Sequence, residues 1–442
     1  LYIAEVAEAL EEEGGGVRYA REGEEGGQIR ERKIKGMLYA DDICIVANTE
    51  NELTETLGRI SKVALEYGLS ISEKKSMVVA VNGEDQGREW RIGEKRIREV
   101  ERTKYLGARV EGGRTGGIKL MEDRVKDIGK TIGMLKFAAA RSGNRFYVGR
   151  EGWKGLVVGR LMYGAGATGW RREERNKVEQ MQKDFGRWLW RFGGSVRTMC
   201  IRGETGWSTF EEREMRAKIM FVDRVINGTG IVPEIARGVL MELGQRSDWW
   251  RGVRKMVERL EIQEVVNLIW LRRASPRGRR ELSIAETAVM KKVVKIKVAE
   301  YGKRAWEQGA GENEDLLEYV RRKPDLIKEE YADGSDGARV RVMLRGESLP
   351  VRSNSTVRWR WGENDRCSCG ERETERHVLL ECEELGNIRR DLAEWWRDRM
   401  GDEDIIRGIK GYVRMETEFE KTLLRRVGDV WKMYEKRARE RG

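Results

Sequence analysis

The chain has 442 residues, of which 39% are hydrophobic and 37% are charged, so it can form two or three domains but has a thin core for its length. Lys and Arg outnumber Asp and Glu by 87 to 76, and the net charge of +11 is spread along the chain, which favours either a polyanionic partner or solvated helix faces of mixed charge. The absence of any apolar stretch of about 18 residues excludes a transmembrane helix, and five cysteines are too few for a disulfide framework and indicate a reducing compartment.

Two adjacent carboxylates, Asp41 and Asp42, stand between short hydrophobic runs in the stretch GMLYADDICIVANT, residues 36–49. From Ile34 to Ala47 apolar side chains dominate on both sides of the acids, which predicts a buried β-hairpin with the acids at its tip. Two carboxylates held together at a turn repel each other, so they are stable as a pair mainly beside a cation. Adjacent acids also occur in ordinary exposed turns, but the hydrophobic flanks and Tyr39 favour a site for a divalent metal.

The next segments predict a helix and several short strands. In NTENELTETLGRISKVALEYG, Thr49 and Glu52 fit a capping box, and Gly68 is a natural stop. One face of this helix carries Leu53, Leu57, Ile60, Ala64 and Tyr67. Short strands are expected at 77–81, 90–92 and 105–110.

Beyond EGGRTGG, residues 111–117, the pattern changes to long amphipathic helices. The first of them is predicted from an apolar stripe that consists of Ile118, Met121, Val125, Ile128, Ile132 and Leu135. Its polar side is basic and carries Lys119, Arg124, Lys126, Lys130 and Lys136. We place a domain boundary near residue 113, a second break in RASPRGRRELS at 273–283 and a third near Pro350.

YADD at 39–42, GLSISEKKS at 68–76 and KYLGARV at 104–110 are three motifs that together resemble segments of the reverse transcriptases of non-LTR, LINE-type retrotransposons. Tyr39-Ala40-Asp41-Asp42 is similar to the YADD box of that family. GLSISEKKS at 68–76 resembles its G-L-x-x-N-x-x-K-T segment, with Ser72 in place of Asn and Ser76 in place of Thr, and KYLGARV at 104–110 resembles its primer grip. Three motifs in the family's order and spacing are far more specific than any one of them.

The resemblance implies an α+β fold with part of a reverse-transcriptase palm, in which antiparallel strands and helices bind Mg²⁺, or Mn²⁺ as the alternative ion. The ions lower the pKa of the primer 3′-hydroxyl and bridge the incoming triphosphate. Asp41 carries over as the main metal ligand, Asp42 as its supporting acid and Lys75 as the lysine near the triphosphate. Lys74 is the alternative for that lysine, and a solvated surface lysine is the alternative role for Lys75. The binding positions around them are Tyr39, Lys104, Tyr105, Leu106 and Gly107.

A two-metal site needs a further carboxylate, which the family supplies from an earlier strand. Residues 1–40 contain no Asp, and LYIAEV resembles the end of the helix that follows the family's template-contacting segment. The acidic start, without an initiator methionine, does not fit a signal peptide. We therefore expect the chain to be the C-terminal portion of a longer enzyme, without its fingers and first catalytic strand, and not to polymerise by itself.

Three stretches in the middle resemble segments that follow LINE-type polymerase domains, without an assigned chemistry: LMYGAGATGW (161–170), ERNKVEQMQKDFGRWLWRF (174–192) and ETGWSTFEEREMRAKIMF (204–221). At the thumb position, residues 118–192, a basic stripe is expected to follow the duplex backbone. Tryptophans could stack on bases but are expected in the core, namely Trp188, Trp190, Trp207, Trp249, Trp250 and Trp270. The arginine run at 272–280 either contacts RNA or DNA or is a solvated linker.

Three cysteines and the only histidine of the chain gather in CSCGERETERHVLLEC, residues 367–382. They are Cys367, Cys369, His377 and Cys382, in a C-x-C-x7-H-x4-C arrangement. Three thiolates and one imidazole complete a tetrahedral set for one structural Zn²⁺. Gly370 permits a tight turn, and ETERHVLLEC is expected to form a short helix that presents His377 and Cys382 to the same ion. Non-LTR elements commonly carry such a knuckle after the polymerase; scattered buried thiols with a surface histidine are the alternative.

Four parts are predicted: the C-terminal part of the palm at 1–112, a helical thumb at 113–195, a helical extension at 196–350, and the zinc knuckle with C-terminal helices at 351–442. In the intact protein the implied function is RNA-directed DNA synthesis, which extends a DNA primer or target end on an RNA template with dNTPs. The family implies an intracellular location, in cytoplasm and nucleus, and no membrane partner is expected. Residues 383–442 show no P-D, D, K set, so no nuclease is predicted.

Two alternatives remain open at this point. One is a non-catalytic nucleic-acid-binding remnant that uses the basic thumb and the zinc knuckle. The other is a protein like the group II intron maturases, which share the YADD hairpin but make the C-terminal knuckle harder to place.

Overall fold

The computed structural model of the chain describes residues 2–11, 15–22, 29–81, 89–113, 117–119, 121–194, 196–228, 230–243, 247–267, 284–355 and 364–440. It divides into two compact units, each of which has a discontinuous sequence. Unit 1 comprises Leu1–Lys126, Met162–Trp170 and Glu214–Lys295; unit 2 comprises Asp127–Leu161, Arg171–Arg213 and Ile296–Gly442. The four sequence-based parts stay a prediction.

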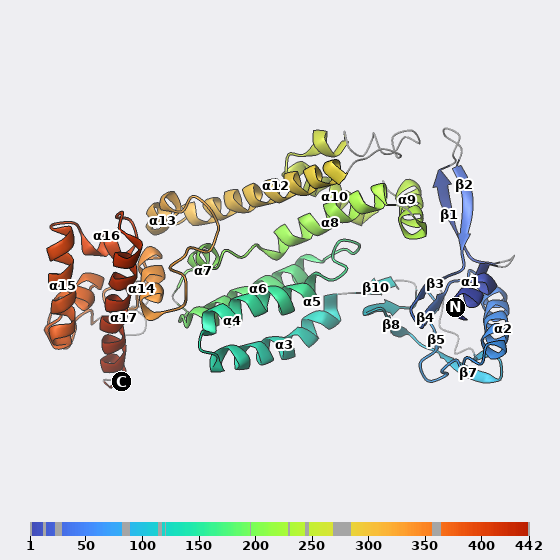
Figure 1. The fold of residues 1–442 in the computed structure, drawn as a ribbon, viewed down its shortest axis with the longest axis horizontal. Helices are drawn as coiled ribbons and strands as arrows, with labels where there is room; N and C mark the ends of the chain where they lie inside the picture. The colour runs from blue at the N-terminus through green and yellow to red at the C-terminus, as the bar shows by residue number, and fades with distance from the viewer. Residues whose placement is uncertain are drawn as a thin grey trace. The chain divides into compact units, whose positions relative to one another are not determined.

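Unit 1 begins with helices and short strands, drawn in blue in Figure 1. In chain order they are α1 Tyr2–Glu11, β1 Val17–Glu22, β2 Ile29–Ile34, β3 Gly36–Tyr39, β4 Asp42–Ile45, α2 Glu50–Glu66, β5 Met77–Val78, β6 Glu89–Ile92, β7 Lys95–Glu99, β8 Arg102–Tyr105, β9 Ala108–Glu111 and β10 Gly117–Lys119. Within the described ranges, β1–β2 and β3–β4 are antiparallel pairs, and two further sheets have the orders β5-β7-β6 and β10-β9-β8. Only the short β5–β7 pairing is parallel among these described strands.

The rest of the described chain is helical. The elements are α3 Met121–Arg141, α4 Arg145–Gly152, the π-helical η1 Trp153–Val158, α5 Gly159–Met162, α6 Arg172–Trp190, α7 Thr198–Thr205, α8 Phe210–Asn227, α9 Ile231–Leu243, α10 Asp248–Arg259, α12 Ile284–Gly311, η3 Glu314–Leu316, α13 Leu317–Arg322, α14 Asp336–Arg345, η5 His377–Glu381, η6 Glu383–Leu385, α15 Gly386–Met400, α16 Ile405–Ile409 and α17 Thr417–Glu440. This mixture of helices and small sheets confirms the α+β class. Among the described helices, none has the length and apolar character needed to cross a bilayer.

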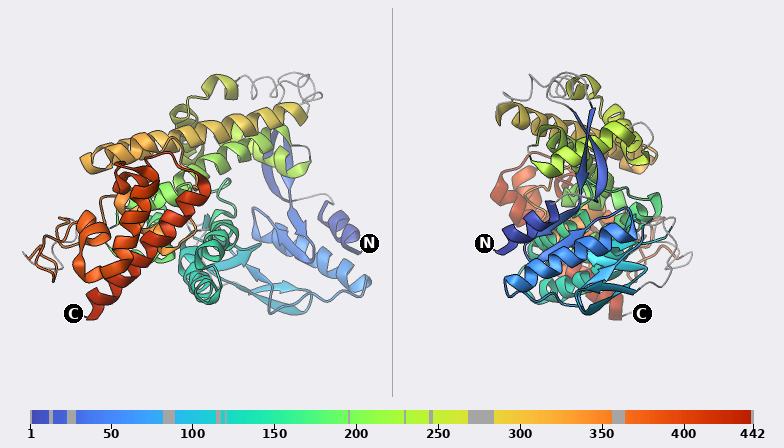
Figure 2. Two further views of the ribbon diagram at one scale, coloured as in Figure 1. Left: turned by 60° about the vertical axis from the view of Figure 1, so that its left-hand side comes forward. Right: turned by 90° about the vertical axis from the view of Figure 1, so that its right-hand side faces the viewer.

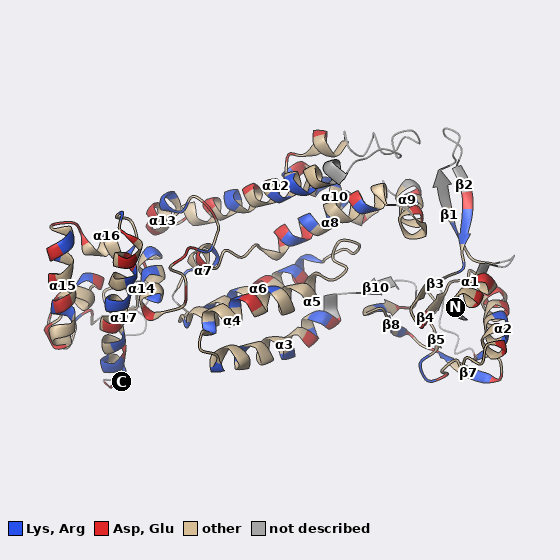
Figure 3. Ribbon diagram, in the orientation of Figure 1, with Lys and Arg blue, Asp and Glu red and all other residues tan. Residues whose placement is uncertain are grey.

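Charge of both signs is distributed along these helices. Figure 3 shows Lys and Arg interspersed with Asp and Glu on α6, α12 and α17. Such mixed faces are well solvated, so the net positive charge of the chain is not gathered on one of these helices.

The helix predicted after the acidic hairpin forms as α2. The Thr49 hydroxyl accepts a hydrogen bond from the N–H of Glu52 at 3.3 Å, and the Glu52 carboxylate accepts one from the N–H of Asn48 at 2.9 Å. Gly68, with φ of +66°, follows the last turn, as expected for a glycine stop. Tyr67 was expected on the buried face, but it is 40% exposed because it lies past the end of the helix.

The structure corrects one strand prediction and one helix prediction. Residues 105–110 do not form one strand: β8 ends at Tyr105, a turn follows, and β9 begins at Ala108. Ile118 lies in β10 and pairs with Val110, so it is not part of the apolar helix stripe, which begins with α3. Leu106 and Gly107, between β8 and β9, both have positive φ, which permits the first of these reversals.

Tryptophans contribute strongly to the core of unit 2. Trp153 stacks on Phe185 with ring centroids 4.6 Å apart and also lies beside Trp207. The core prediction is confirmed for Trp190 and Trp207, which are buried. Three further tryptophans are half-buried, namely Trp188, Trp249 and Trp250. Trp270, the arginine run at 272–280 and the break at 273–283 lie outside the described residues.

Candidate functional site

The acidic pair lies at the tip of the hairpin formed by β3 and β4, as the sequence predicts. Tyr39 pairs with Asp42, which leaves Ala40 and Asp41 as a two-residue turn. Ala40 has φ of +53°, a conformation uncommon for residues other than glycine. The turn therefore holds both carboxylates at an exposed position, where water or a metal ion can reach them.

Apolar packing anchors one face of this hairpin. Leu38 and Ile45 pack against Val6 and Leu10 of α1 and against Ile60 of α2, and Figures 1 and 2 show both helices beside the two strands. The two acids thus lie at the end of strands that are held in place by packing against α1 and α2.

The other face of the hairpin is only partly covered within the described residues. Met37 and Tyr39, which lie on it, are 42% and 64% exposed, so the expectation of a buried hairpin is wrong for this face. Ile43, on the covered face with Leu38, is also 38% exposed. A two-stranded ribbon has two faces, and here α1 and α2 cover only one of them. The exposed aromatic and aliphatic side chains beside two acids suit a surface that receives an organic substrate.

The second hairpin of the candidate site joins β8 and β9. Tyr105 pairs with Ala108, and the two turn residues, Leu106 and Gly107, have φ of +47° and +75°. Positive φ at both positions characterises a type I′ turn. Lys104, Leu106 and Gly107 are exposed, whereas Tyr105 is half-buried.

The two hairpins lie within electrostatic reach of each other. Burial raises the pKa of the Tyr105 phenol, and negative charge on Cys44 and on Asp42 raises it further. The predicted binding residue Tyr105 therefore lies within electrostatic reach of the predicted metal ligand Asp42.

Lys75 lies in an exposed turn at 73–75, directly before β5. The N–H groups of Lys75 and Ser76 both donate to the carbonyl oxygen of Ser72, at 3.2 and 3.0 Å. Lys74 is exposed in the same turn, so both alternatives for the triphosphate lysine stay open.

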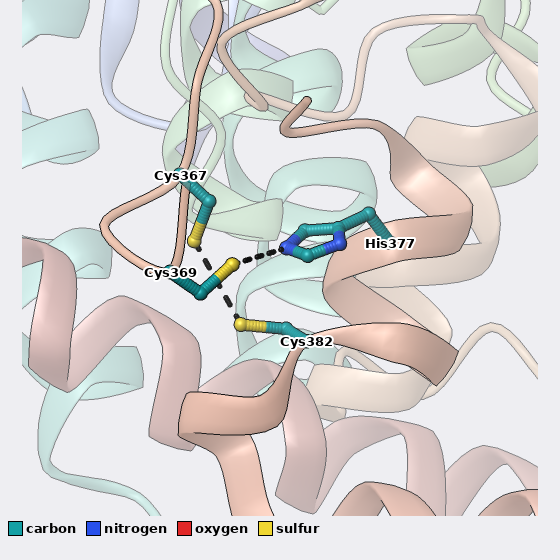
Figure 4. A group of neighbouring side chains, drawn as sticks. All are labelled: Cys367, Cys369, His377 and Cys382. Atoms are coloured by element: carbon teal, nitrogen blue, oxygen red, sulfur yellow. Dashed lines mark hydrogen bonds between the residues drawn. The ribbon is translucent and has the colours of Figure 1, made fainter. Parts of the chain in front are cut away.

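The cysteine and histidine side chains predicted to bind zinc converge in unit 2, as Figure 4 shows. Sγ of Cys367 lies 3.7 Å from Sγ of Cys382, Sγ of Cys369 lies 3.3 Å from Nε2 of His377, and all four ligand atoms lie within 4.8 Å of one another. From Zn–S and Zn–N bonds of about 2.3 and 2.0 Å, a tetrahedral ion separates two sulfurs by roughly 3.8 Å and a sulfur and a nitrogen by roughly 3.5 Å. The four side chains therefore fit a zinc ion.

Local backbone geometry explains this convergence. After Cys369 the chain reverses at Gly370, which has φ of +94°, and the N–H of Gly370 donates to the carbonyl oxygen of Cys367 at 2.9 Å. The predicted short helix forms as the π-helical turn η5, which carries His377. The N–H of Cys382 donates to the carbonyl oxygen of His377 at 2.7 Å, so both ligands face the same space.

Hydrogen bonds favour a thiolate at Cys367. Burial opposes ionisation of this thiol, but donors from the backbone of Cys369 and from the side chains of His377, Ser368 and Cys382 outweigh it and lower the pKa of Cys367 to about 6. Burial and the charge of Cys367 raise the pKa of Cys382 to about 12. Cys367 is thus more readily ionised than Cys382, and a bound metal would displace the remaining thiol protons.

Arg389 is a supporting residue that the sequence did not single out. Its guanidinium, on α15, donates to the carbonyl oxygens of Cys382 and Leu380 at 2.8 and 3.0 Å. Such contacts hold the end of the turn that carries the last ligand. Nothing in the local pattern distinguishes Arg389 from the adjacent Arg390, because the contact depends on how α15 packs.

A comparison with protein families matches residues 23–110 to reverse transcriptase (RNA-dependent DNA polymerase). The matched segment contains both hairpins, α2 and Lys75, and the cysteine cluster lies outside it. No curated protein matches the chain. The match supports a reverse transcriptase, an enzyme type that binds a template, a primer and dNTPs and generally uses Mg²⁺.

Proposed function

We propose that the chain is part of the RNA-directed DNA polymerase of a non-LTR, LINE-type retrotransposon. The observation that carries this proposal is the exposed Asp41–Asp42 turn, which lies at the tip of the β3–β4 hairpin within the reverse transcriptase match. The resemblance is also the basis for proposing an intracellular location, in cytoplasm and nucleus.

In this function Asp41 and Asp42 hold Mg²⁺, or Mn²⁺ as the alternative ion, at the turn. An ion held there would supply a lowered pKa of the primer 3′-hydroxyl and positive charge beside the triphosphate. Lys75 supplies a cation toward the triphosphate, and the 104–107 turn contacts the primer. Exposure of both carboxylates fits this role, because substrate oxygens complete the coordination of a catalytic ion.

A third acidic ligand for a two-metal site has to come from elsewhere. Within the described ranges, the only group of three or more possible ligand side chains is the cysteine cluster. We therefore propose that the 442-residue chain incorporates no nucleotide by itself. Template-directed dNTP incorporation by this purified chain with Mg²⁺ would overturn this part of the proposal.

The metal role of the hairpin is tested by Mn²⁺ binding in the presence of an RNA template, a DNA primer and dNTP. Electron paramagnetic resonance is expected to show bound Mn²⁺ with the unaltered chain and a clear loss with Asp41→Asn or Asp42→Asn. Glu55→Gln, on an exposed part of α2, is the matched control and should bind Mn²⁺ as the unaltered chain does. Equal binding by all four proteins contradicts the assignment.

The cysteine cluster is proposed to hold one structural zinc. Its four ligand atoms supply a complete set without an open position, so the ion supports folding and does not activate water. The alternative function, a nucleic-acid-binding protein without catalysis, shares this zinc site and the basic thumb. Binding of the RNA–DNA template–primer without any dependence on Mn²⁺ or on Asp41 favours that alternative.

A further inference from the structure

The turn between β8 and β9 needs support from outside its own sheet. Among the described strands its sheet has the order β10-β9-β8, so β8 is an edge strand there. Leu106 has positive φ, a conformation that costs on the order of 1 kcal/mol for a residue with a side chain, and it is 37% exposed. Without further contacts, such a turn changes its position easily.

Tyr163 makes the contact that holds this turn. Its hydroxyl donates a hydrogen bond to the carbonyl oxygen of Leu106 at 3.0 Å. A Cβ atom placed on Gly107 would lie 3.8 Å from Cε1 of Tyr163, so the ring lies directly beside the turn. Tyr163 belongs to LMYGAGATGW, a stretch for which the sequence suggested no chemistry, and its side chain lies 57 residues beyond Leu106 in the chain.

Arg124 holds the side chain of Tyr163 in place. The Arg124 guanidinium lies 4.8 Å from the centroid of the Tyr163 ring and donates a hydrogen bond to the Tyr163 carbonyl oxygen. A cation over an aromatic face restricts the rotation of the ring, so the hydroxyl stays directed at the turn. Arg124 lies near the start of α3, the helix that carries the predicted basic thumb stripe.

The neighbouring residue on α3 holds the same hairpin at a second point. Asp123 accepts a hydrogen bond from Arg109 of β9 at 3.0 Å, and Arg109 also pairs with Glu111 at 3.0 Å. The Arg109 side chain is only 9% exposed, so solvent screens this ion pair less than it screens a surface pair. Asp123 and Arg124 therefore connect α3 to the strand and, through Tyr163, to the turn. All of these residues belong to unit 1.

We propose that Tyr163 is a positioning residue, which holds the Leu106–Gly107 turn against α3 and so sets where the primer 3′ end lies beside Asp41 and Asp42. This inference rests on the proposed function, because the primer is the partner assigned to the turn. Tyr163 acts through the turn and not on the reacting atoms. Its loss is expected to displace the primer end while leaving the affinity for the duplex nearly unchanged.

The test uses Tyr163→Phe in the full chain with an RNA template and a DNA primer that carries 2-aminopurine at its 3′ end. The emission of the bound 2-aminopurine is expected to move toward that of the free template–primer. The Kd, measured by anisotropy of a label at the far end, should stay within about twofold, since one exposed hydrogen bond contributes little. Amide hydrogen exchange at residues 105–108 of the free protein should become about fivefold faster.

Tyr147→Phe is the matched control, because Tyr147 is an exposed tyrosine on α4 and should leave emission and exchange unchanged. Unchanged emission with Tyr163→Phe, or exchange at 105–108 equal to that of the unaltered chain, overturns the inference. If Tyr163→Phe lowers the melting temperature and the affinity for the template–primer together with the emission change, the inference is also overturned, because that pattern indicates a tyrosine with a purely structural role. If the unaltered chain does not bind the template–primer, the proposed function fails and the primer role fails with it, whereas the exchange result still decides whether Tyr163 holds the turn.

Discussion

The two candidate metal sites differ in how much of the coordination the protein itself provides. At the cysteine cluster, four ligand atoms lie within 4.8 Å of one another, and three of the four residues are buried. At the hairpin, two carboxylates stand exposed on a two-residue turn. A complete buried set retains a metal as part of the fold, whereas an open pair leaves coordination positions for substrates. We therefore propose that metal binding serves stability at the cysteine cluster and substrate binding at the hairpin.

The largest effect in this comparison is expected from removal of a zinc ligand. Cys382→Ser should abolish zinc binding and unfold the module around residues 364–440, because a structural zinc contributes on the order of 10 kcal/mol to such folds. Metal analysis and thermal unfolding with and without a chelator measure this. Cys44→Ser is the control, since Cys44 lies on the hairpin outside the cluster. A zinc content near one per chain in Cys382→Ser protein, or none in the unaltered chain prepared without chelator, contradicts the assignment.

A buried charge in unit 2 is expected to give the next largest effect. Glu204 is fully buried on α7, accepts hydrogen bonds from Tyr319 at 2.8 Å and Arg345 at 3.0 Å, and faces Lys323 at 3.8 Å. Glu204→Gln leaves two buried cations with less compensation and should cost about 3 kcal/mol of unfolding free energy. Denaturant unfolding measures the loss.

The exposed ion pair between Glu418 and Lys421 supplies the control for this prediction. Glu418→Gln should give no measurable change, because solvent screens an exposed pair. Equal effects of the two substitutions would show that burial does not decide the contribution of a charge in this unit.

Arg389 tests whether the cysteine cluster depends on residues beyond its ligands. Arg389→Met removes the two hydrogen bonds to the carbonyl oxygens of Cys382 and Leu380, and the zinc affinity should fall about tenfold. Competition with a chromogenic chelator measures the affinity. Arg390→Met, at the adjacent exposed position on α15, should leave it unchanged. If the two variants bind zinc equally, the ligands alone determine the affinity.

Sequence reasoning succeeded where the residues of a site are close together in the chain. The acids of the hairpin are adjacent, and the four zinc ligands fall within residues 367–382, so their spacing alone constrains the local geometry. The capping residues of α2 are likewise local: Thr49 caps the helix as predicted, whereas Glu52 accepts from the N–H of Asn48 and not of Thr49. In these places the spacing and the chemistry of neighbouring side chains are enough to predict the local structure.

Contacts between distant segments could not be predicted in this way. Tyr163 and Leu106 are 57 residues apart, and Glu204 and Arg345 are 141 residues apart. Apolar content also does not tell which face of a strand is covered, which is why the exposed face of the hairpin, with Met37 and Tyr39, was expected to be buried. These features depend on tertiary packing, which overrides local pattern.

The smallest effect on stability is expected at the hairpin itself. Asp41→Asn removes one of two adjacent negative charges at an exposed turn, so relief of repulsion offsets any lost solvation of the carboxylate. The melting temperature should therefore stay within about 2 °C of that of the unaltered chain, in contrast to the loss expected for Cys382→Ser. Differential scanning calorimetry without divalent metal measures it. A large drop would mean that the Asp41 carboxylate is needed for the hairpin to fold, and the division between a structural and a substrate-binding metal site would then no longer hold.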